Sequence, residues 1–435
     1  MNSDAHSPVP PEPDPLLPRS PLAIADYRRF LLARFLSVSA TTGMVVILGY
    51  QLYDLARSAY GMSMGDAAFQ LGLMGLAQFL PLFLLTPLAG LAADRFDRRL
   101  VASLAIGIDL LVALVLALAT QAQMLSLPLL FALAALHGTA RVFIGPAMSS
   151  IAPNIVPAPL MPKAIAINSM AWQIGSVGGP AVAGLLFALG PAVPYWTSTV
   201  MMALGSALIF SIRALPPPRS AVPVHPLRQM HDGLSFVWND RFLLGCITLD
   251  LFAVLLGGAT ALLPVFARDI LLIDGQPVGA NGLGVMRAMP GVGAALVALW
   301  LSRRPIENEV GLKMMLAVIG FGAITVAFGF STNFYLSLGL LAVLGAADMI
   351  SVFIRSTLVQ LHTPDAVRGR VSSISGLAIS ASNELGELQS GLAAALLGVT
   401  GAVIFGGVGA IAVTAAWFVL FPELKAARTF AARYR

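Results

Sequence analysis

The feature that most constrains this chain is a series of apolar runs, each long enough to cross a lipid bilayer. A helix needs about 20 mostly apolar residues to span the hydrocarbon core. The runs lie near residues 29–53, 68–92, 100–120, 125–150, 163–189, 194–213, 242–266, 280–301, 312–330, 334–360, 372–397 and 401–421. Because backbone polar groups in lipid must be paired internally, such runs are expected to be helical. The sequence therefore predicts an all-α integral membrane protein with twelve transmembrane helices.

The composition agrees with a membrane protein and argues against several other classes. Of the 435 residues, 57% are hydrophobic and only 11% are charged, whereas about a quarter of a soluble domain is charged. The net charge of +5 comes from short clusters between the apolar runs, without the basic stripe of a nucleic-acid-binding protein. The single cysteine, Cys246, allows no intramolecular disulfide, and the histidines are scattered, so no metal and no cofactor are expected.

The positions of the basic residues indicate the orientation. If the N-terminus is cytoplasmic, nearly all lysines and arginines outside the spans fall on the cytoplasmic side, and only Arg57 and Arg268 fall outside. A wrong helix count would scramble this division, so the positive-inside rule supports twelve spans with both termini in the cytoplasm. The expected location is the bacterial cytoplasmic (inner) membrane, which the chain crosses many times.

The chain also repeats itself. Three short patterns from the first half recur in the same order and at nearly one offset in the second half: Arg29-Phe30-Leu31-Leu32 as Arg241-Phe242-Leu243-Leu244, Gly75 with Pro81 as Gly284 with Pro290, and Val142-Phe143-Ile144 as Val352-Phe353-Ile354. These matches predict two pseudo-symmetric six-helix bundles. The expected division is a disordered cytoplasmic tail over 1–21, bundles over 22–213 and 241–424, a Pro-rich cytoplasmic linker over 214–240 and a C-terminal tail over 425–435.

A loop between the second and third spans carries a recognisable motif. Glycine, aspartate and three arginines occur there at fixed spacing: Gly90, Asp94, Arg95, Arg98 and Arg99. This pattern resembles the signature loop of the major facilitator superfamily, and the resemblance extends from about residue 22 to 425. It implies the major facilitator fold and a loop that braces the two halves in one conformation. An aspartate among arginines can form an ion-pair cluster that locks one state and releases another.

Two further segments resemble parts of the same superfamily. The fifth span contains Gly175, Gly179, Pro180 and Gly184, similar to the Gly-Pro motif of antiporters. Small residues also let membrane helices pack closely, so the motif favours antiport and simple packing about equally. Near the C-terminus, Arg368-Gly369-Arg370-Val371 and Leu385-Gly386-Glu387 look like the branch that contains the enterobactin exporter and macrolide efflux pumps. That resemblance implies an exporter of siderophore-like or drug-like molecules.

Ionisable residues inside the spans are costly, and each is by default a functional hypothesis. The candidates for proton coupling are the four acids Glu384, Glu387, Asp109 and Asp250. Candidate cavity charges are Arg141, Arg287, Asp348 and Arg355. Glu384 and Glu387 share a helix face, where they repel each other unless one takes up a proton, so this pair is the first candidate. The alternatives are structural ion pairs and, for Glu387, a solvated position at the outer mouth.

The resemblance also implies that the first, fourth, seventh and tenth spans line the cavity. These spans carry several aromatic and methionine side chains that suit a bulky, amphipathic or aromatic cargo: Met44, Tyr50, Tyr53, Phe143, Met148, Phe252, Phe266, Met349 and Phe353. Arg34 and Asp54 are expected at the span ends, where a long arginine can reach the headgroups.

The sequence as a whole predicts a monomeric secondary active transporter, a proton-coupled exporter of a small organic molecule that works by alternating access. It contains no Gly-x-x-x-x-Gly-Lys-Ser/Thr phosphate loop, so ATP is not expected to drive transport directly. The alternatives are an importer and a lysolipid flippase of the same fold. A receptor or an enzyme is the least favoured class, because no extended soluble domain or reactive constellation is present.

Overall fold

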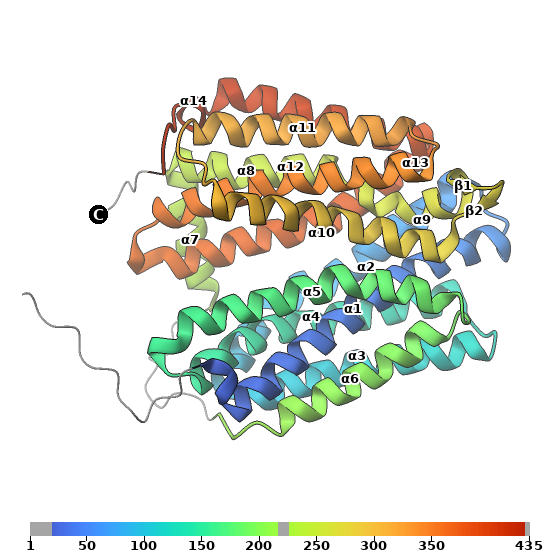
Figure 1. Ribbon diagram of the computed structural model, residues 1–435, viewed down its shortest axis with the longest axis horizontal. Coiled ribbons are helices and arrows are strands. Elements are labelled where there is room, and N and C mark those ends of the chain that lie inside the picture. The colour runs from blue at the N-terminus through green and yellow to red at the C-terminus, as the bar shows by residue number, and fades with distance from the viewer. Residues whose placement is uncertain (1–19, 216–225, 431–435) are drawn as a thin grey trace, which may run out of the picture.

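The computed structural model describes residues 20–215 and 226–430, and this part of the chain is almost entirely helical (Figure 1). The N-terminal tail expected over 1–21 and the last residues of the C-terminal tail fall largely outside it. The first half consists of α1 (Ala25–Ser58), α2 (Met64–Arg95), α3 (Arg98–Gln121), α4 (Leu127–Ile155), α5 (Met161–Phe187) and α6 (Val193–Phe210). Short 3-10 turns, η1 (Pro21–Ala23) and η2 (Ala158–Leu160), precede α1 and α5.

The second half begins with α8 (Arg241–Leu256). This helix breaks and continues through η3 (Ala259–Leu262), α9 (Leu263–Val265) and the π-helical turn η4 (Phe266–Ile270). A two-stranded hairpin, β1 (Leu272–Ile273) and β2 (Gln276–Pro277), follows in antiparallel register. The remaining elements are α10 (Gly279–Arg303), α11 (Val310–Phe330), α12 (Phe334–Leu361), α13 (Asp365–Leu420) and α14 (Pro422–Lys425).

The number of spans agrees with the sequence once α13 is divided. Among the described residues, 11 helices are long and apolar enough to cross a membrane. The last of them, α13, has 56 residues and is interrupted at Gly398, where φ is 74° and ψ is 165°. This left-handed backbone suits glycine, which has no Cβ to clash. Gly398 therefore separates an eleventh and a twelfth span, as the apolar runs 372–397 and 401–421 predict.

All spans run between two ends of the molecule, which we name by what they carry (Figure 1). The hairpin end holds the β1–β2 hairpin and the turn between α1 and α2, and the tail end holds the start of α1, α7 and α14. Side chains at the turns fix where several helices begin. Ser63, Asp97 and Ser126 accept hydrogen bonds from the first turns of α2, α3 and α4, and such N-caps contribute about 1 kcal/mol each.

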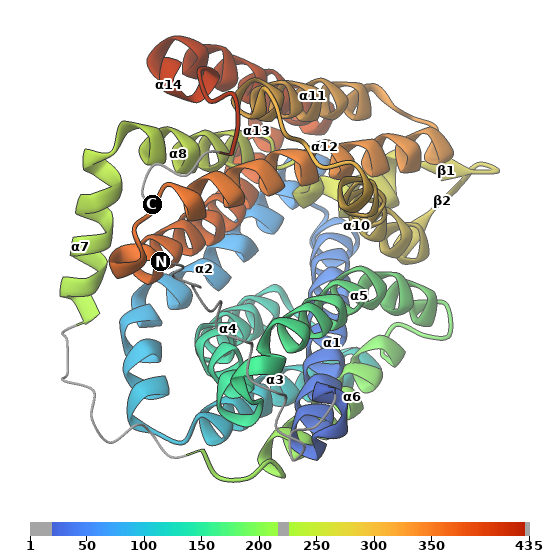
Figure 2. The ribbon, with the colours of Figure 1, turned by 60° about the vertical axis from the view of Figure 1, so that its left-hand side comes forward.

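The segment between the halves contains a helix. The sequence indicates a linker over 214–240, and α7 (Pro226–Asn239) occupies most of its second part. Figure 2 shows α7 at the tail end beside α8 and α13. Asp232 on α7 lies 3.6 Å from the guanidinium of Arg370 on α13. This helix is therefore attached to the second half.

The repeated sequence patterns have counterparts in the contacts. Arg29, at the start of α1, donates a 3.0 Å hydrogen bond to the carbonyl of Ser211, just after α6. Arg241, at the start of α8, donates a 2.8 Å bond to the carbonyl of Leu420, the last residue of α13. Each arginine thus joins the first span of its half to the last one. Each half is therefore closed in the same way at the tail end.

The two halves meet along two helix pairs, α2 with α13 and α5 with α10. Glycines allow both contacts, because a Cβ on Gly284 would lie 2.9 Å from the Cα of Gly184 and one on Gly75 would lie 2.9 Å from the Cβ of Glu387. Gly75 and Gly284 are the equivalent glycines of the sequence repeat. The repeat therefore preserves the close approach of the halves, as small residues do in membrane helix packing.

The apolar core shows which end is closed. The larger core cluster contains side chains of both halves, among them Leu52 and Tyr53 of α1 with Phe266 and Leu271 near the hairpin end. A second cluster, which includes Cys246 and Met314, draws only on the second half and its linker helix. Among the described residues, the halves therefore share an apolar core toward the hairpin end and keep separate packing at the tail end.

Candidate functional site

Two adjoining chambers lie between the halves in the middle of the spans. The first chamber, of about 500 Å³, is lined by α1, α4 and α5 of the first half and by α10. The second chamber, of about 570 Å³, is lined mainly by α8, α10, α12 and α13, with α5 opposite. Trp172, Ser176 and Arg287 line both chambers. The chambers are therefore two parts of one central site between the halves.

A charged group crosses the central site from one half to the other. Arg141 on α4 donates a 2.6 Å hydrogen bond to Glu384 on α13, and Glu384 is 6% exposed. Glu387, one helical turn later, interacts electrostatically with Glu384, Arg287 and Arg141 and lines the second chamber. The structure thus brings together two predicted coupling acids and two predicted cavity arginines. The alternative position of Glu387 at a solvated outer mouth does not fit this geometry.

Asp109 has a partner that the sequence did not indicate. Its carboxylate lies 2.8 Å from Nδ1 of His137 on α4, and the hydroxyl of Thr41 donates to it over 3.3 Å. Asp109 and His137 are each 1% exposed. This group lies inside the first half, and His137 also lines the first chamber. The signal that could have found it is the position of His137, one helical turn from Arg141 inside a span.

The other intramembrane charges form a group in the second half. Asp250 on α8 forms an ion pair with Arg355 on α12, and both are less than 10% exposed. Asp348 interacts electrostatically with both residues and lines the second chamber. The expectation that Arg355 is a cavity charge is corrected, because Arg355 is not among the residues that line either chamber. It packs inside the half, where Asp250 compensates its charge.

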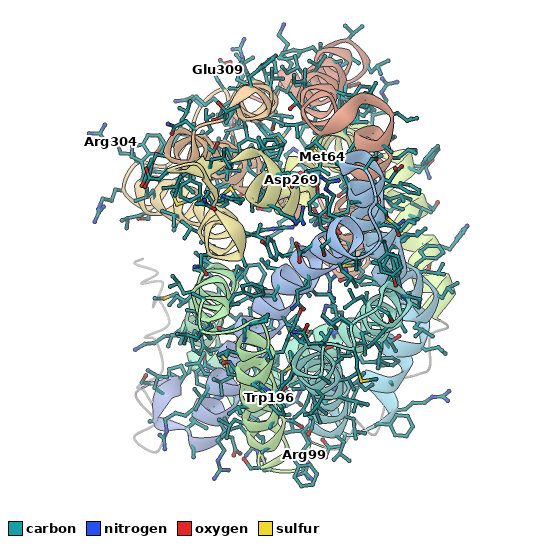
Figure 3. The ribbon with its side chains drawn as sticks, turned by 90° about the vertical axis from the view of Figure 1, so that its right-hand side faces the viewer. Met64, Arg99, Trp196, Asp269, Arg304 and Glu309 are labelled. Atoms are coloured by element: carbon teal, nitrogen blue, oxygen red, sulfur yellow. The ribbon has the colours of Figure 1, made fainter. Side chains whose placement is uncertain are left out.

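A cluster of charges connects the halves at the hairpin end. We name the hairpin-end cluster for its five members: Tyr53, Asp54 and Arg57 of α1 with Arg268 and Asp269 of η4. Asp269 accepts hydrogen bonds of 2.5 Å from Tyr53 and 3.2 Å from Arg57. Arg268 donates a 2.5 Å bond to Asp54. Figure 3, which faces this end, shows Asp269 where the second half meets the first.

Part of this cluster could be predicted from the sequence. Arg57 and Arg268 are the two basic residues that it assigns to the outer side, and Asp54 stands at the adjacent span end. Asp54 lies at the span end where it is expected, and it pairs with Arg268 across the halves. Two basic residues next to carboxylates, on a side with no other lysine or arginine outside the spans, would have been sufficient reason to propose an ion-pair cluster there.

Comparisons with known proteins agree with this architecture. Residues 25–433 match the family model described as transmembrane secretion effector. The chain belongs to this family of major facilitator transporters. It is 26% identical over 382 residues to the enterobactin exporter EntS of Shigella dysenteriae, an alignment that covers 87% of this chain and 86% of that protein. The same exporter of an Escherichia coli strain has the same identity and coverage.

Solved structures show the same fold at lower identity. The nucleoside transporter NupG superposes with a TM-score of 0.69 at 14% identity, covering 91% of this chain and 99% of that one. A D-xylose-proton symporter gives 0.68 at 14% identity, covering 92% and 98%. These matches show the major facilitator fold. The family match makes the chain a multi-pass membrane transporter rather than an enzyme.

The signature loop of this family member is tied to its own half. Asp97 caps α3, and its carboxylate lies 2.9 Å from the Arg99 guanidinium. Arg99 also donates to the carbonyls of Phe210 and Ile212 at the end of α6. Gly90 and Asp94 lie in the same stretch, but their side chains are outside the described part of the chain. In the described part of this loop, the ion pair is the one between Asp97 and Arg99.

The structure also describes the side chains of two other arginines of the motif. Arg95 is exposed beyond the end of the membrane span of α2. Arg98 is half-buried, and its Nε has no hydrogen-bond partner among the described residues. The brace between halves that the resemblance implies for this loop therefore remains a prediction for another conformation.

The glycines of the α5 motif have two different neighbours. A Cβ on Gly175 or Gly179 would meet Ser39 of α1, within the first half. The Pro180 carbonyl and Gly184 instead face Gly284 of α10, across the halves. The motif therefore contributes to packing within a half and to the contact between halves, as both interpretations of the sequence allowed.

Most of the aromatic and methionine side chains that were expected in the cavity do not line the two chambers. Of the nine side chains, Met148 and Met349 line the chambers, whereas Met44, Tyr53 and Phe266 are buried in the shared core. Trp172 comes from α5, a span that the resemblance did not select. Arg34 also differs from expectation, because it lines the first chamber instead of reaching the headgroups.

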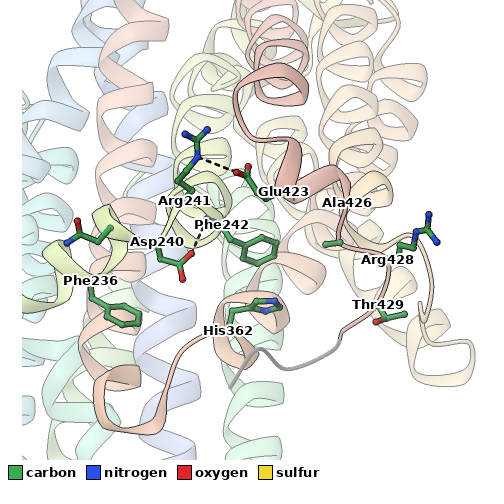
Figure 4. Close-up of a pocket in the computed structure, with 11 residues that line it drawn as sticks. Phe236, Asp240, Arg241, Phe242, His362, Glu423, Ala426, Arg428 and Thr429 are labelled. Atoms are coloured by element: carbon green, nitrogen blue, oxygen red, sulfur yellow. Dashed lines mark hydrogen bonds and ion pairs between the residues drawn. The ribbon is translucent and has the colours of Figure 1, made fainter. Parts of the chain in front are cut away.

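A further cavity, of about 850 Å³, lies elsewhere, at the tail end of the second half. Figure 4 shows the side chains that surround it, with Arg241 3.3 Å from Glu423 and the ring of Phe242 on that of His362. Its lining comes from the linker helix, the start of α8, His362 just after the end of α12, and the segment after α13. It is therefore a surface cleft of one half, away from the path between the halves.

Proposed function

We propose that this protein is a secondary active exporter that moves a small organic molecule out of the cytoplasm by alternating access. The tail end faces the cytoplasm, as the positive-inside rule favours. The bundles 22–213 and 241–424 rock against each other around the two chambers. The division into these units rests on the repeat and on the equivalent closing contacts of Arg29 and Arg241.

The observation that carries the proposal is the Arg141–Glu384 ion pair, which joins the halves at a chamber in the middle of the spans. An ion pair between two moving bodies has to break and re-form when they rock. The hairpin-end cluster and the shared apolar core close the opposite end. This arrangement corresponds to a conformation that opens toward the cytoplasm, as loading of an exported molecule requires.

Glu384 and Glu387 support proton coupling in this proposal. Glu384 bonds to Arg141, and Glu387 interacts electrostatically with Glu384, Arg287 and Arg141. Gly386, which lies between the two acids, packs against Gly258 at the break of α8. A proton on Glu384 would weaken its bond to Arg141, because the pair would lose its charge attraction. Proton uptake would thereby release one half from the other. Asp109 and Asp250 remain secondary candidates, since each is paired within its own half.

The direction and the cargo are proposed from similarity. The chain is 26% identical to proteins named enterobactin exporters, over most of both lengths. We therefore expect export of a siderophore-like or drug-like molecule across the bacterial cytoplasmic membrane.

The test compares a strain that lacks the gene with its parent under iron starvation, with siderophore measured inside and outside the cells. The deletion strain should retain siderophore, and the wild-type gene should restore secretion. Glu384→Gln should not restore it, whereas Glu307→Gln should, because Glu307 is an exposed acid outside the spans. Equal expression of both variants in the membrane has to be verified by immunoblotting.

Unchanged secretion would remove the siderophore from the proposal. A panel of fluorescent drugs, followed in the same strains with and without a protonophore, then tests the drug-like class. Higher accumulation in the deletion strain supports an exporter. Lower accumulation would overturn export in favour of import, and no change with any compound would overturn a role in drug or siderophore efflux.

A further inference from the structure

The first chamber has an unusual distribution of charge. Three arginines line it, Arg34 from α1, Arg141 from α4 and Arg287 from α10. Among the described residues that line this chamber, no aspartate or glutamate occurs. The acids of the central site, Asp348 and Glu387, line the second chamber instead. The central site is therefore divided into a cationic part and a part of mixed charge.

The arginines of the first chamber are incompletely satisfied. The Nε atoms of Arg34 and Arg287 are buried without a hydrogen-bond partner in the described part of the chain. The same holds for Nε2 of His137, which also lines the chamber. Buried donors without partners are rare, because each one loses its hydrogen bonds to water without gaining another. Because such donors are costly inside a membrane, we expect them to bind a ligand rather than another group of the protein.

The remaining lining suits an organic molecule with a charged group. Hydroxyl-bearing side chains of Thr41, Thr42 and Ser176 lie on the walls. Trp172 lines both chambers, and the apolar side chains of Ile144 and Met148 line the first chamber with it. Guanidinium groups pair with carboxylates, phosphates and sulfonates through two parallel hydrogen bonds. In a medium of lower polarity than water these attractions are stronger.

We propose that the first chamber is an anion-binding subsite, which holds the negatively charged group of an aromatic or amphipathic organic anion. Arg34 and Arg287 bind the anionic group from the two halves, and Trp172 packs against its apolar body. This inference rests on the proposed transport function and adds the chemical class of the transported molecule. It assigns Arg34, which the sequence placed at the headgroups, to substrate binding.

The test uses two dyes with the same ring system and opposite charge. Purified protein in nanodiscs of zwitterionic phosphatidylcholine is titrated into fluorescein, an anion, or rhodamine 6G, a cation, and fluorescence anisotropy reports binding. Fluorescein should bind more tightly than rhodamine 6G by about 10-fold, which corresponds to about 1.4 kcal/mol. Equal binding of the two dyes, or a preference for the cation, overturns the proposal.

Variants assign the preference to the chamber. Arg34→Gln with Arg287→Gln should weaken fluorescein binding by about 10-fold or more and leave rhodamine 6G unaffected or tighter. Arg34→Lys with Arg287→Lys should retain part of the preference, because the charge remains, and this pair covers a failure of the glutamine variant to fold. The matched control is Arg303→Gln, which removes an exposed arginine from the same helix as Arg287. Unchanged binding in the double glutamine variant would contradict the proposal.

A second measurement does not depend on dye affinity. In a protein whose only tryptophan is Trp172, with the other four replaced by phenylalanine, iodide and acrylamide are compared as quenchers. A cationic chamber concentrates iodide, so its quenching relative to neutral acrylamide should exceed that of free tryptophan and fall in the Arg34→Gln, Arg287→Gln background. A ratio equal to that of free tryptophan overturns the anion subsite.

Both measurements are made at equilibrium and are independent of transport direction and of protons. If anions bind but deletion of the gene changes no accumulation, the subsite stands and the exporter proposal fails. If export is found and the anion preference is absent, the exporter stands and the subsite fails.

Discussion

Arg141 on α4 donates a 2.6 Å hydrogen bond to Glu384 on α13, so the two halves of the transporter are joined by an ion pair in the middle of the spans. The two residues are far apart in sequence: Arg141 lines the first chamber, and Glu384 is a neighbour of Asn383, which lines the second. Glu384 is buried, whereas 37% of the Arg141 side chain remains exposed to the chamber. A substrate can therefore reach the pair at Arg141, which is the exposed partner.

The first prediction concerns this pair. Glu384→Gln keeps the shape of the side chain and removes its charge, so proton-driven export should fall to the level seen with a protonophore. Because chamber water screens the exposed Arg141, we expect a coupling free energy of only about 1 kcal/mol in a double-mutant cycle with Arg141→Gln. SDS-induced unfolding of the purified variants measures that energy. Additive effects of the two changes would show that the contact contributes nothing, and full export by Glu384→Gln would exclude Glu384 from coupling.

The spans could be predicted from the sequence because hydrophobic length and the placement of basic residues are local properties. The repeat, too, was visible in short identical patterns such as that of Arg29 and Arg241. Glu384 and Glu387 could be chosen because they are acids on one face of an apolar helix. In each case the information lies within one segment of the chain.

The pairings could not be predicted, because they depend on which helices become neighbours and on how each is rotated about its axis. A helix that is apolar on nearly all sides, such as α5, gives no sign of which face meets a cavity. Trp172 and Ser176 were missed for this reason, and so was the bond between Asp109 and His137. Family expectation about which spans line the cavity selected the wrong aromatic residues for the same reason.

The second prediction concerns the hairpin-end cluster. Asp269→Asn weakens the contacts to Arg57 and Tyr53, so the conformation that is closed at this end should become less populated. Ser176→Cys in a Cys246→Ser background reports this change, because Ser176 lines both chambers. A membrane-impermeant maleimide applied to the outer face of right-side-out vesicles should label the Asp269→Asn protein several-fold faster than the parent.

Asp274→Asn is the matched control for this experiment. Asp274 lies in the turn of the β1–β2 hairpin and is exposed, so its replacement should leave the labelling rate unchanged. If Asp269→Asn also has no effect, the cluster does not hold the hairpin end closed. Labelling in inside-out vesicles should be fast in all of these proteins if the tail end opens to the cytoplasm, as we propose.

The third prediction concerns the contact of α5 with α10. A Cβ on Gly184 would lie 2.8 Å from the carbonyl oxygen of Ala280 and 2.9 Å from the Cα of Gly284. Gly184→Ala should therefore push the halves apart at a cost of about 1–3 kcal/mol, which lowers the thermal unfolding midpoint and the transport rate. Gly178→Ala on the same helix meets nothing within 4 Å and should be neutral or stabilising by up to about 1 kcal/mol through helix propensity. Equal midpoints for the two variants would contradict close packing at Gly184.

The last prediction separates a structural ion pair from a coupling site in the second half. Asp250 and Arg355 are 8% and 6% exposed and form an ion pair with each other. Removal of one partner leaves a buried charge, so Asp250→Ala should destabilise the protein by about 3–5 kcal/mol, whereas replacing both, as Asp250→Leu with Arg355→Met, should restore most of that loss. If the pair only stabilises the half, the double variant exports normally and with unchanged protonophore sensitivity. A stable double variant that no longer responds to the proton gradient would instead make Asp250 part of the coupling path and displace Glu384 as its principal residue.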